Sequence, residues 1–527
     1  MELGTVISTM DGPTTTLFSF VITQANVRKG QFVQTQTEDG LLIGMVTEIT
    51  RANRYFERAE SVAEYERSGM PGSGGMGAGS AGALLGAGGA GAAASGITAN
   101  FPTKDWEYVI ANVKALGIYK EKLLSRSSFP AAPGARVLAA DEKLLTEFLG
   151  FVDDGLNIGK LQNHNVEVKL KLNRLLQKHL AILGMSGSGK SYCTASLIEE
   201  LLDRKKELGR MAVIVIDVHG EYIGFKQSAY GDRTNIFDGK KIRIALRKLS
   251  PQMLAEFMPD LSPPQKRLLG KTLNEMKFES KQKHEAFDLD DLVGRIESEG
   301  GEKESALRSV LCAWLQDLKG VRIIGKVDNP KMEELAVAGK LAVVDLSDID
   351  SMKRKQLIVA YFGKKLFTAR KKGKIPPFAF MVEEAHNFAT EKAPKGSSLS
   401  KGIIETMARE GRKFGASLCL ITQRPVKLST TALSQCNSNI IMRITNPFDI
   451  KHIGESCEGI DYNMQNSITS LRTGEGIIIG EAANHPVFIK VRARKSKCPP
   501  KGESLEKLAA EYEKAHEKKK EDVEAFL

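Results

Sequence analysis

Hydrophobic and polar positions follow two different patterns along this chain of 527 residues. Over residues 1–150 the apolar positions form short runs rich in β-branched and aromatic side chains, separated by turns such as Asp11-Gly12-Pro13. Such runs favour strands, which we expect at residues 14–22, 31–36, 41–49, 106–115 and 135–139. Short strands without long helices between them predict a small β-barrel.

From about residue 152 the apolar runs become continuous and alternate with segments of helical character. Continuous β-branched runs are typical of strands buried on both faces, and alternation with helices predicts a parallel α/β core. We expect core strands at residues 180–183, 211–216, 341–344, 378–382, 416–421, 439–444 and 476–479.

Two further segments break this alternation. Residues 250–318 have a helical pattern throughout, which predicts a helical subdomain inserted into the core. Residues 501–526 predict a charged helix with an apolar stripe of Leu505, Leu508, Ala509 and Tyr512,. A lone helix of this kind is marginal in water, so we expect it to pack on another surface, such as a neighbouring subunit.

The predicted domains are a barrel at 1–150 with a Gly/Ala-rich insertion at 70–97, a core at 151–249 and 319–495, the helical insertion at 250–318, and a helical extension at 496–527.

Composition narrows the class of protein. A formal net charge of +11 and an isoelectric point near 9.1 favour a polyanionic partner, either nucleic acid or an anionic membrane surface,. The six cysteines have no CxxC spacing, so neither a disulfide framework nor a zinc site is indicated,. The N-terminus has no signal-peptide pattern. The Gly/Ala-rich run carries little hydrophobic area, so we interpret it as a linker rather than a membrane span and expect a cytoplasmic protein.

The most specific motif is the sequence GMSGSGKS at residues 184–191. An apolar run precedes it and a helical segment follows, which is the context of a nucleotide-binding P-loop. Closely spaced glycines let backbone N–H groups surround phosphate oxygens. Lys190 would reach the β- and γ-phosphates and Ser191 would ligate Mg²⁺. We therefore expect ATP to bind at Gly184, Ser186, Gly187, Ser188, Gly189, Lys190, Ser191 and Tyr192.

The apolar run 378–382 ends in two adjacent carboxylates, Glu383 and Glu384. A P-loop enzyme needs one acidic group to hold the metal and another to polarise the attacking water. We assign the metal role to Glu383 and the role of base to Glu384. A surface acidic pair at the end of a strand is the alternative, but the upstream P-loop favours a functional pair.

Three other polar positions are weaker candidates. Gln423 ends another apolar run and is our candidate sensor of the γ-phosphate or the lytic water, although a capped strand end would also explain it. Arg409 and Arg412 could stabilise phosphoryl charge across a subunit interface, or they could be cations at a solvated helix C-terminus. Asp217 and Glu221 follow the 211–216 run, where they either support the metal or form a polar turn,.

Together these motifs resemble the HerA family of DNA-translocating ATPases within the HerA/FtsK group. The resemblance rests on GMSGSGKS, DVHGEY, FMVEEAHNF, AREGRKFGASLCLITQRP and SQCNSNIIMRITNPFD in this order, and it covers nearly the whole chain except the Gly/Ala-rich run. It implies a RecA-like P-loop core with an N-terminal barrel and a hexameric ring that encircles double-stranded DNA. It further implies action with a NurA-type nuclease, and with other end-processing factors, in DNA resection.

By the family pattern, Lys190, Ser191, Glu383, Glu384 and Gln423 carry ATP binding and hydrolysis. One departure is that Glu383 stands where Asp is more usual, and the Gly/Ala-rich insertion is another. Lys395 and Lys401 flank a loop that could line a DNA channel. The competing hypotheses are a membrane-associated secretion or conjugation ATPase and a non-catalytic scaffold; the intact Glu384 and the lack of a predicted stable membrane anchor disfavour them.

Overall fold

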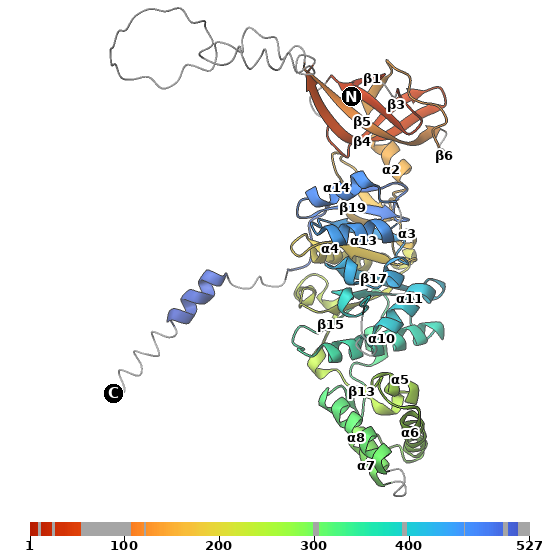
Figure 1. Ribbon diagram of the computed structural model, residues 1–527, viewed down its shortest axis with the longest axis vertical. Helices are drawn as coiled ribbons and strands as arrows, with labels where there is room; N and C mark the ends of the chain where they lie inside the picture. The colour runs from red at the N-terminus through yellow and green to blue at the C-terminus, as the bar shows by residue number, and fades with distance from the viewer. Residues whose placement is uncertain are drawn as a thin grey trace, which may run out of the picture. The chain divides into compact units, whose positions relative to one another are not determined.

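The structure is a computed structural model that describes residues 1–8, 12–23, 27–53, 107–120, 123–298, 305–392, 398–457, 459–498 and 504–514 (Figure 1). The chain divides into two compact units. The first comprises Met1–Gly150 and Leu161–Val166, and the second comprises Phe151–Lys160 and Glu167–Leu527. The predicted Gly/Ala-rich insertion at 70–97 lies outside the described residues, as does Trp106 of the expected strand at 106–115.

The first unit is a closed barrel, as predicted. Its strands are β1 (Glu2–Ile7), β2 (Leu17–Ile22), β3 (Phe32–Thr37), β4 (Gly40–Asn53), β5 (Glu107–Lys120) and β7 (Arg136–Ala139), with the short β6 (Leu123–Ser125) added along β5. Their order is β2-β1-β7-β3-β4-β5, and an antiparallel pairing of β2 with β5 closes the ring. Closure leaves neither of these two strands as a free edge.

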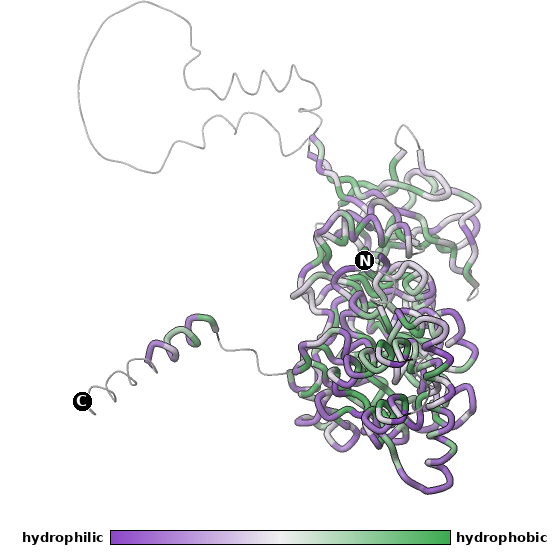
Figure 2. The backbone as a smooth tube through the Cα atoms, turned by 60° about the horizontal axis from the view of Figure 1, so that its bottom comes forward, coloured by the Kyte–Doolittle hydropathy of each residue, from purple (hydrophilic) through white to green (hydrophobic). Residues whose placement is uncertain are grey.

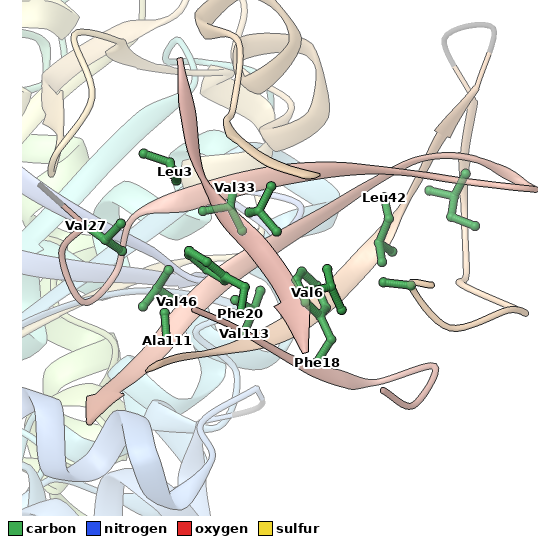
Figure 3. Packing of buried hydrophobic residues seen from close by; sticks show 13 residues of the cluster. Leu3, Val6, Phe18, Phe20, Val27, Val33, Leu42, Val46, Ala111 and Val113 are labelled. Carbon is green, nitrogen blue, oxygen red and sulfur yellow. The ribbon is translucent and has the colours of Figure 1, made fainter. Parts of the chain in front are cut away.

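Every second side chain along a strand such as β2 points into the barrel and helps to fill it. Phe18 and Phe20 of β2 point into the hydrophobic core, whereas Ser19 between them donates a hydrogen bond from Oγ to Asn112 Oδ1 at 2.8 Å. Figure 3 shows the two phenylalanines among aliphatic side chains from β1, β3, β4 and β5. The helix α2 (Glu142–Leu149) follows β7 and begins at Asp141, whose carboxylate accepts hydrogen bonds from two backbone N–H groups of the first turn,.

The second unit is built on a sheet of eleven strands in the order β12-β15-β11-β16-β17-β10-β18-β19-β20-β8-β9. From β12 to β18 every neighbouring pair is parallel, which confirms the predicted parallel α/β core. The strands that correspond to predicted runs are β10 (Leu180–Leu183), β11 (Ala212–Asp217), β15 (Leu341–Asp345), β16 (Phe378–Val382), β17 (Ala416–Thr422), β18 (Ser438–Met442) and β19 (Glu475–Gly480).

Four strands lie at the two sides of the sheet and were not predicted. They are β8 (Leu156–Leu161), β9 (Glu167–Leu170), β12 (Thr234–Asp238) and β20 (Val487–Val491). β19 pairs antiparallel with both β18 and β20, and β8 pairs antiparallel with β9. The sheet is therefore parallel where it carries the P-loop and mixed at one side.

Helices connect the parallel strands, as the right-handed crossover of a parallel sheet requires. They include α4 (Lys190–Asp203), α9 (Met332–Leu335), α10 (Met352–Lys371), α11 (Lys401–Phe414) and α12 (Thr430–Leu433). The short α3 (Leu172–Leu176) precedes β10, and α13 (Pro447–Ser456) and α14 (Tyr462–Ser470) follow β18. None of the helices in the described ranges is long and apolar enough to cross a membrane.

A helical segment interrupts the core between β12 and β15. It contains α5 (Pro251–Glu256), α6 (Pro263–Lys283), α7 (Leu289–Ser298) and α8 (Ser305–Gly320), which Figure 1 shows grouped together. Ser250 and Ser262 cap α5 and α6, and a proline follows each serine at the first helical position,. These caps explain why the prolines stand at the breaks of the helical pattern. The short parallel pair β13 (Ile244–Ala245) and β14 (Ile324–Gly325) joins the two ends of this segment.

Within the described part of the C-terminal extension, residues 505–514 form a helix. Its predicted apolar stripe is exposed in this single chain, with Leu505 83% and Tyr512 66% exposed. Figure 2 shows hydrophobic and hydrophilic residues alternating along it. The expectation that this stripe packs on another surface therefore remains a prediction.

Candidate functional site

The P-loop connects β10 to α4, and its backbone is held open from several sides. Gly187 and Gly189 have φ values of 74° and 105°, which favour glycine,. Met185 N donates to Arg443 O at 2.9 Å, and Gly474 N donates to Ser188 O at 3.0 Å. The loop is therefore fixed by the ends of neighbouring strands before any phosphate binds.

The side chains of the loop differ in what they do. Ser188 is buried and its hydroxyl donates to Met185 O at 2.8 Å, so it stabilises the turn. Ser186 is exposed and Ser191 is half-buried. The hydroxyl of Tyr192 accepts a hydrogen bond from Arg494 N at 2.7 Å. The sequence predicts Tyr192 in the nucleotide site, whereas its observed bond links α4 to the segment after β20.

Lys190 is 8% exposed, and its Nζ donates to Met185 O at 2.9 Å. Burial lowers the pKa of Lys190, and the carboxylates of Glu384, Glu221 and Glu383 oppose that effect. The ammonium group thus lies within electrostatic range of three carboxylates. Only one of its three N–H groups is occupied by the loop, which leaves donors for a phosphate oxygen.

The topology explains how these carboxylates come together. β10, β11, β16 and β17 are parallel neighbours, so their carboxyl ends meet at one edge of the sheet,. Asp217 ends β11, Glu383 and Glu384 follow β16, and Glu221 lies in the turn after β11. We refer to Asp217, Glu221, Glu383 and Glu384 as the acidic cluster.

Glu383 is 4% exposed, and its Oε2 accepts a hydrogen bond from Val218 N at 3.0 Å. Its carboxyl group also lies close to that of Asp217. Burial and the negative charges of Asp217 and Glu221 raise the pKa of Glu383. Two buried carboxyl groups in contact favour a shared proton or a bound cation, because both cannot be ionised without cost.

Asp217 organises the DVHGEY turn. Its Oδ1 accepts from Glu221 N at 3.0 Å and from His219 N at 3.3 Å, and its Oδ2 accepts from Tyr222 N at 2.9 Å. Burial raises the pKa of Asp217, although these backbone hydrogen bonds act in the opposite direction. Asp217 therefore both forms the polar turn and touches Glu383, so the two alternatives left open by the sequence are compatible.

Glu384 has a left-handed backbone, with φ 47° and ψ 43°, which is uncommon for a residue other than glycine,. Such strain often occurs at functional sites. The side chain is 9% exposed, and Gln423 lies close enough to it to lower its pKa. Burial raises the pKa of Glu384, and Lys190 and His219 oppose that shift. The two predicted catalytic carboxylates and Gln423 are thus adjacent.

His386 is a neighbour of this site that the sequence analysis did not single out. Its Nδ1 lies 3.2 Å from Glu384 Oε2 and 2.9 Å from Thr422 Oγ1. Burial lowers the pKa of His386 to about 4, so the ring is neutral at neutral pH and does not form an ion pair with Glu384. Its bond is with Thr422, and Glu384 Oε2 makes no hydrogen bond. The position of a histidine two residues after the acidic pair was the available signal.

Oxygen donors at this edge fit a magnesium ion. Among the residues that the structure describes, no three His, Cys, Asp or Glu side chains form a metal site by themselves. Mg²⁺ is usually held by one or two carboxylates together with waters and substrate phosphates. Glu221 Oε2 and Glu384 Oε2 are buried and lack hydrogen-bond partners, so acceptor capacity remains beside Ser191 and Glu383.

Arg409 and Arg412 lie elsewhere. Both are exposed in the last two turns of α11, which ends just before β17 begins. β17 is seven residues long, so its start is about 20 Å from the edge that carries the P-loop. The structure therefore does not bring either arginine to the chain's own P-loop. Lys401 donates to Glu391 O at 3.0 Å, and Lys395 lies outside the described residues.

A P-loop at the end of a parallel sheet, with a buried acidic pair on a neighbouring strand, defines a RecA-like P-loop ATPase. The family described as "Helicase HerA, central domain" matches residues 156–366. The chain is 31% identical over 404 residues to the DNA double-strand break repair helicase HerA of Sulfolobus acidocaldarius, covering 73% of this chain and 78% of that protein. The chain belongs to the HerA family and is an ATP-hydrolysing enzyme of the helicase and translocase class.

Other similarities agree with this placement. A probable helicase of Methanocaldococcus jannaschii is 30% identical over 408 residues, covering 73% of this chain and 76% of that protein. HerA of Sulfurisphaera tokodaii is 26% identical and aligns over 99% of both chains. Among solved structures, VirB4 of Thermoanaerobacter pseudethanolicus has a TM-score of 0.51 at 15% identity, covering 65% of this chain and 97% of that one. This last likeness concerns the fold alone.

Proposed function

We propose that this protein is an ATP-driven translocase on double-stranded DNA that forms a hexameric ring. In this proposal it acts in the cytoplasm with a NurA-type nuclease in resecting DNA ends for recombinational repair. The observation that carries the proposal is the buried Glu383–Glu384 pair beside Lys190. The names of its relatives, which are DNA double-strand break repair helicases, support the choice of substrate.

The geometry supports the following division of roles. The backbone N–H groups of the P-loop bind phosphate oxygens, and Lys190 exchanges its bond with Met185 O for one with a phosphate,. Ser191 and Glu383 hold Mg²⁺, which supplies charge neutralisation for the phosphates. Glu384 accepts a proton from the attacking water, and the neighbouring Gln423 orients its carboxylate,.

The base assignment is tested by Glu384→Gln. We expect the variant to bind ATP and to lose hydrolysis by at least about a hundredfold, because general-base catalysis contributes about 10²–10⁴. Glu333→Gln, an exposed glutamate on α9, is the matched control and should retain hydrolysis. Persistent hydrolysis in Glu384→Gln would show that another group activates the water.

Arg409 and Arg412 are proposed to complete the site of the next subunit. Their exposure and their distance from the chain's own P-loop suit an arginine that acts in trans,. Mixing an Arg409→Ala/Arg412→Ala variant with a Lys190→Ala variant should restore part of the ATPase activity, because some interfaces then combine an intact P-loop with intact arginines. An absence of any recovery in mixed rings would contradict a trans role.

The substrate and the assembly need separate measurements. ATPase activity should be measured with blunt, tailed and single-stranded DNA, and the same sample should be imaged by electron microscopy for rings. We expect stimulation by duplex DNA and six-membered rings. Basal hydrolysis that no DNA stimulates would favour the alternative of a secretion or conjugation ATPase.

A further inference from the structure

An excess of positive charge is concentrated on α10 and its surroundings. Residues 351–382 contain nine Lys or Arg and no Asp or Glu, whereas the whole chain has a net charge of only +11. α6 of the helical segment adds six Lys or Arg against two Glu. None of the roles assigned above to the ATP site uses these cations.

Two lysines from these helices are fixed on adjacent residues of one segment. Lys277 of α6 donates from Nζ to Leu249 O, and Lys365 of α10 donates from Nζ to Lys248 O at 3.1 Å. Lys365 also lies 5.5 Å from the centre of the Tyr361 ring. Both lysines are half-buried, so these bonds hold the two ammonium groups beside each other instead of letting them separate into solvent.

Other lysines surround this pair. Burial is the main cause that lowers the pKa values of Lys277 and Lys365. Repulsion adds to this effect, from Lys281 on Lys277 and from Lys372 on Lys365. Lys248 also repels Lys365, and it forms a 2.7 Å ion pair with Asp328. We call Lys248, Lys277, Lys281, Lys365 and Lys372 the lysine cluster. In the described part of the chain, Asp328 is the carboxylate that forms a salt bridge with it.

Such an arrangement costs free energy in the isolated chain. Like charges held together repel, and long lysine side chains normally spread into water. Each anchored ammonium group still has two N–H donors beyond its backbone bond. A site of this kind is completed by an anion that has several oxygen acceptors.

We propose that the lysine cluster binds the sugar-phosphate backbone of DNA, at the junction of the helical segment and α10. This inference rests on the proposed function, because it names a contact surface for the same DNA substrate. Lysines are compact point charges that suit phosphates without requiring bidentate geometry. A cluster of lysines accordingly favours a contact that is independent of base sequence, as a translocating enzyme needs.

The test measures how salt weakens DNA binding by the full-length chain. The affinity for a labelled blunt duplex would be determined between about 50 and 200 mM salt, the range over which phosphate contacts lose strength. The wild type would be compared with Lys277→Gln/Lys365→Gln and with Lys277→Arg/Lys365→Arg. Lys205→Gln/Lys206→Gln is the matched control, because both lysines are exposed and distant in sequence from the cluster. Thermal melting of each variant verifies folding.

The salt slope is the slope of the logarithm of the DNA affinity against the logarithm of the salt concentration. In the Gln variant this slope should be shallower by about 0.9 for each phosphate that is no longer neutralised, hence by about 2 if both lysines touch phosphates. The Arg variant and the Lys205/Lys206 control should keep the wild-type slope. A wild-type slope in the Gln variant would overturn the proposal, and so would equal reductions in the Gln and Arg variants, which indicate a structural role. A wild-type chain that binds no duplex would instead refute the DNA substrate itself.

Discussion

Replacing Glu199 by glutamine should destabilise the ATPase unit, because Glu199 is a fully buried charge that joins the P-loop helix to the C-terminal segment. Glu199 lies on α4, and its Oε2 accepts from Arg492 Nη1 at 2.8 Å. Its Oε1 accepts from Lys495 N at 2.9 Å, and from Ser496 N and Ser496 Oγ at 2.7 Å each. Every one of these donors belongs to residues just after β20.

The magnitude follows from what glutamine cannot replace. Both oxygens of Glu199 accept hydrogen bonds, whereas the Nε2 of a glutamine is a donor and would face other donors on one side,. Arg492 would also lose a buried anionic partner. Removing one member of a buried ion pair costs about 3–5 kcal/mol. Arg492 Nη2 keeps a 2.9 Å bond to Glu200 Oε1, so we expect the lower end, about 3 kcal/mol,. For a unit of about 370 residues, with about 2.1 cal/mol/K per residue, the melting temperature should fall by about 4 °C.

The pH dependence of the loss in stability tests whether the charge of Glu199 is its cause. Burial raises the pKa of Glu199, but its hydrogen bonds more than compensate, so its folded pKa lies below the ordinary value of 4.5. The stabilisation is therefore present above pH 4.5 and is lost as pH falls through the folded pKa. Calorimetry of Glu199→Gln, with the exposed Glu207→Gln as control, should show the deficit at neutral pH and a smaller one in acid. A deficit below about 1 kcal/mol at neutral pH would refute this reasoning.

Three other results are expected. ATPase activity should decline on acidification from a pH above 4.5, because burial raises the pKa of Glu384 and the base must be ionised; a kcat profile measures this. Gly184→Ala should weaken nucleotide binding roughly ten- to a hundredfold, since a Cβ there lies 2.6 Å from a hydroxyl oxygen of the loop,, whereas Gly402→Ala, which meets nothing within 4 Å, should not. Phe20→Ala should cost the barrel about 3–5 kcal/mol in urea unfolding, unlike the exposed Leu17→Ala,.

The sequence predicted the strands that are buried on both faces better than those at the sides of the sheet. β16 coincides with the predicted run at 378–382 because every residue of FAFMV is buried. β8 and β12 were missed because their sequences, LNIGKL and TNIFD, mix polar and apolar positions over a few residues. Pairing with a neighbouring strand, which sequence periodicity does not report, decides such segments.

At the site too, features that depend on neighbouring residues in the sequence were predicted, whereas features that depend on the fold were not. Adjacent carboxylates at the end of an apolar run predicted Glu383 and Glu384 as site residues without a structure, and both are buried near Lys190. The left-handed backbone of Glu384 and the neutral His386 beside it depend on the turn after β16 and on burial, so the sequence did not predict them. The hydrogen bond between the Tyr192 hydroxyl and Arg494 N is likewise a tertiary contact that the sequence did not predict, and the place of Tyr192 in the nucleotide site stays a prediction.

The charge balance at the P-loop supports a site that a second subunit completes. Three carboxyl groups of the acidic cluster, those of Glu221, Glu383 and Glu384, lie within electrostatic range of one buried ammonium group, that of Lys190. A nucleotide triphosphate adds further negative charge, so binding at this edge requires cations that Lys190 does not provide. Mg²⁺ is one such cation, but charge on the oxygens of the transferred γ-phosphoryl group needs a further donor on the open side. Arg409 and Arg412 are exposed and far from their own P-loop, so in the proposed ring we expect them to reach the open side of the neighbouring subunit's site.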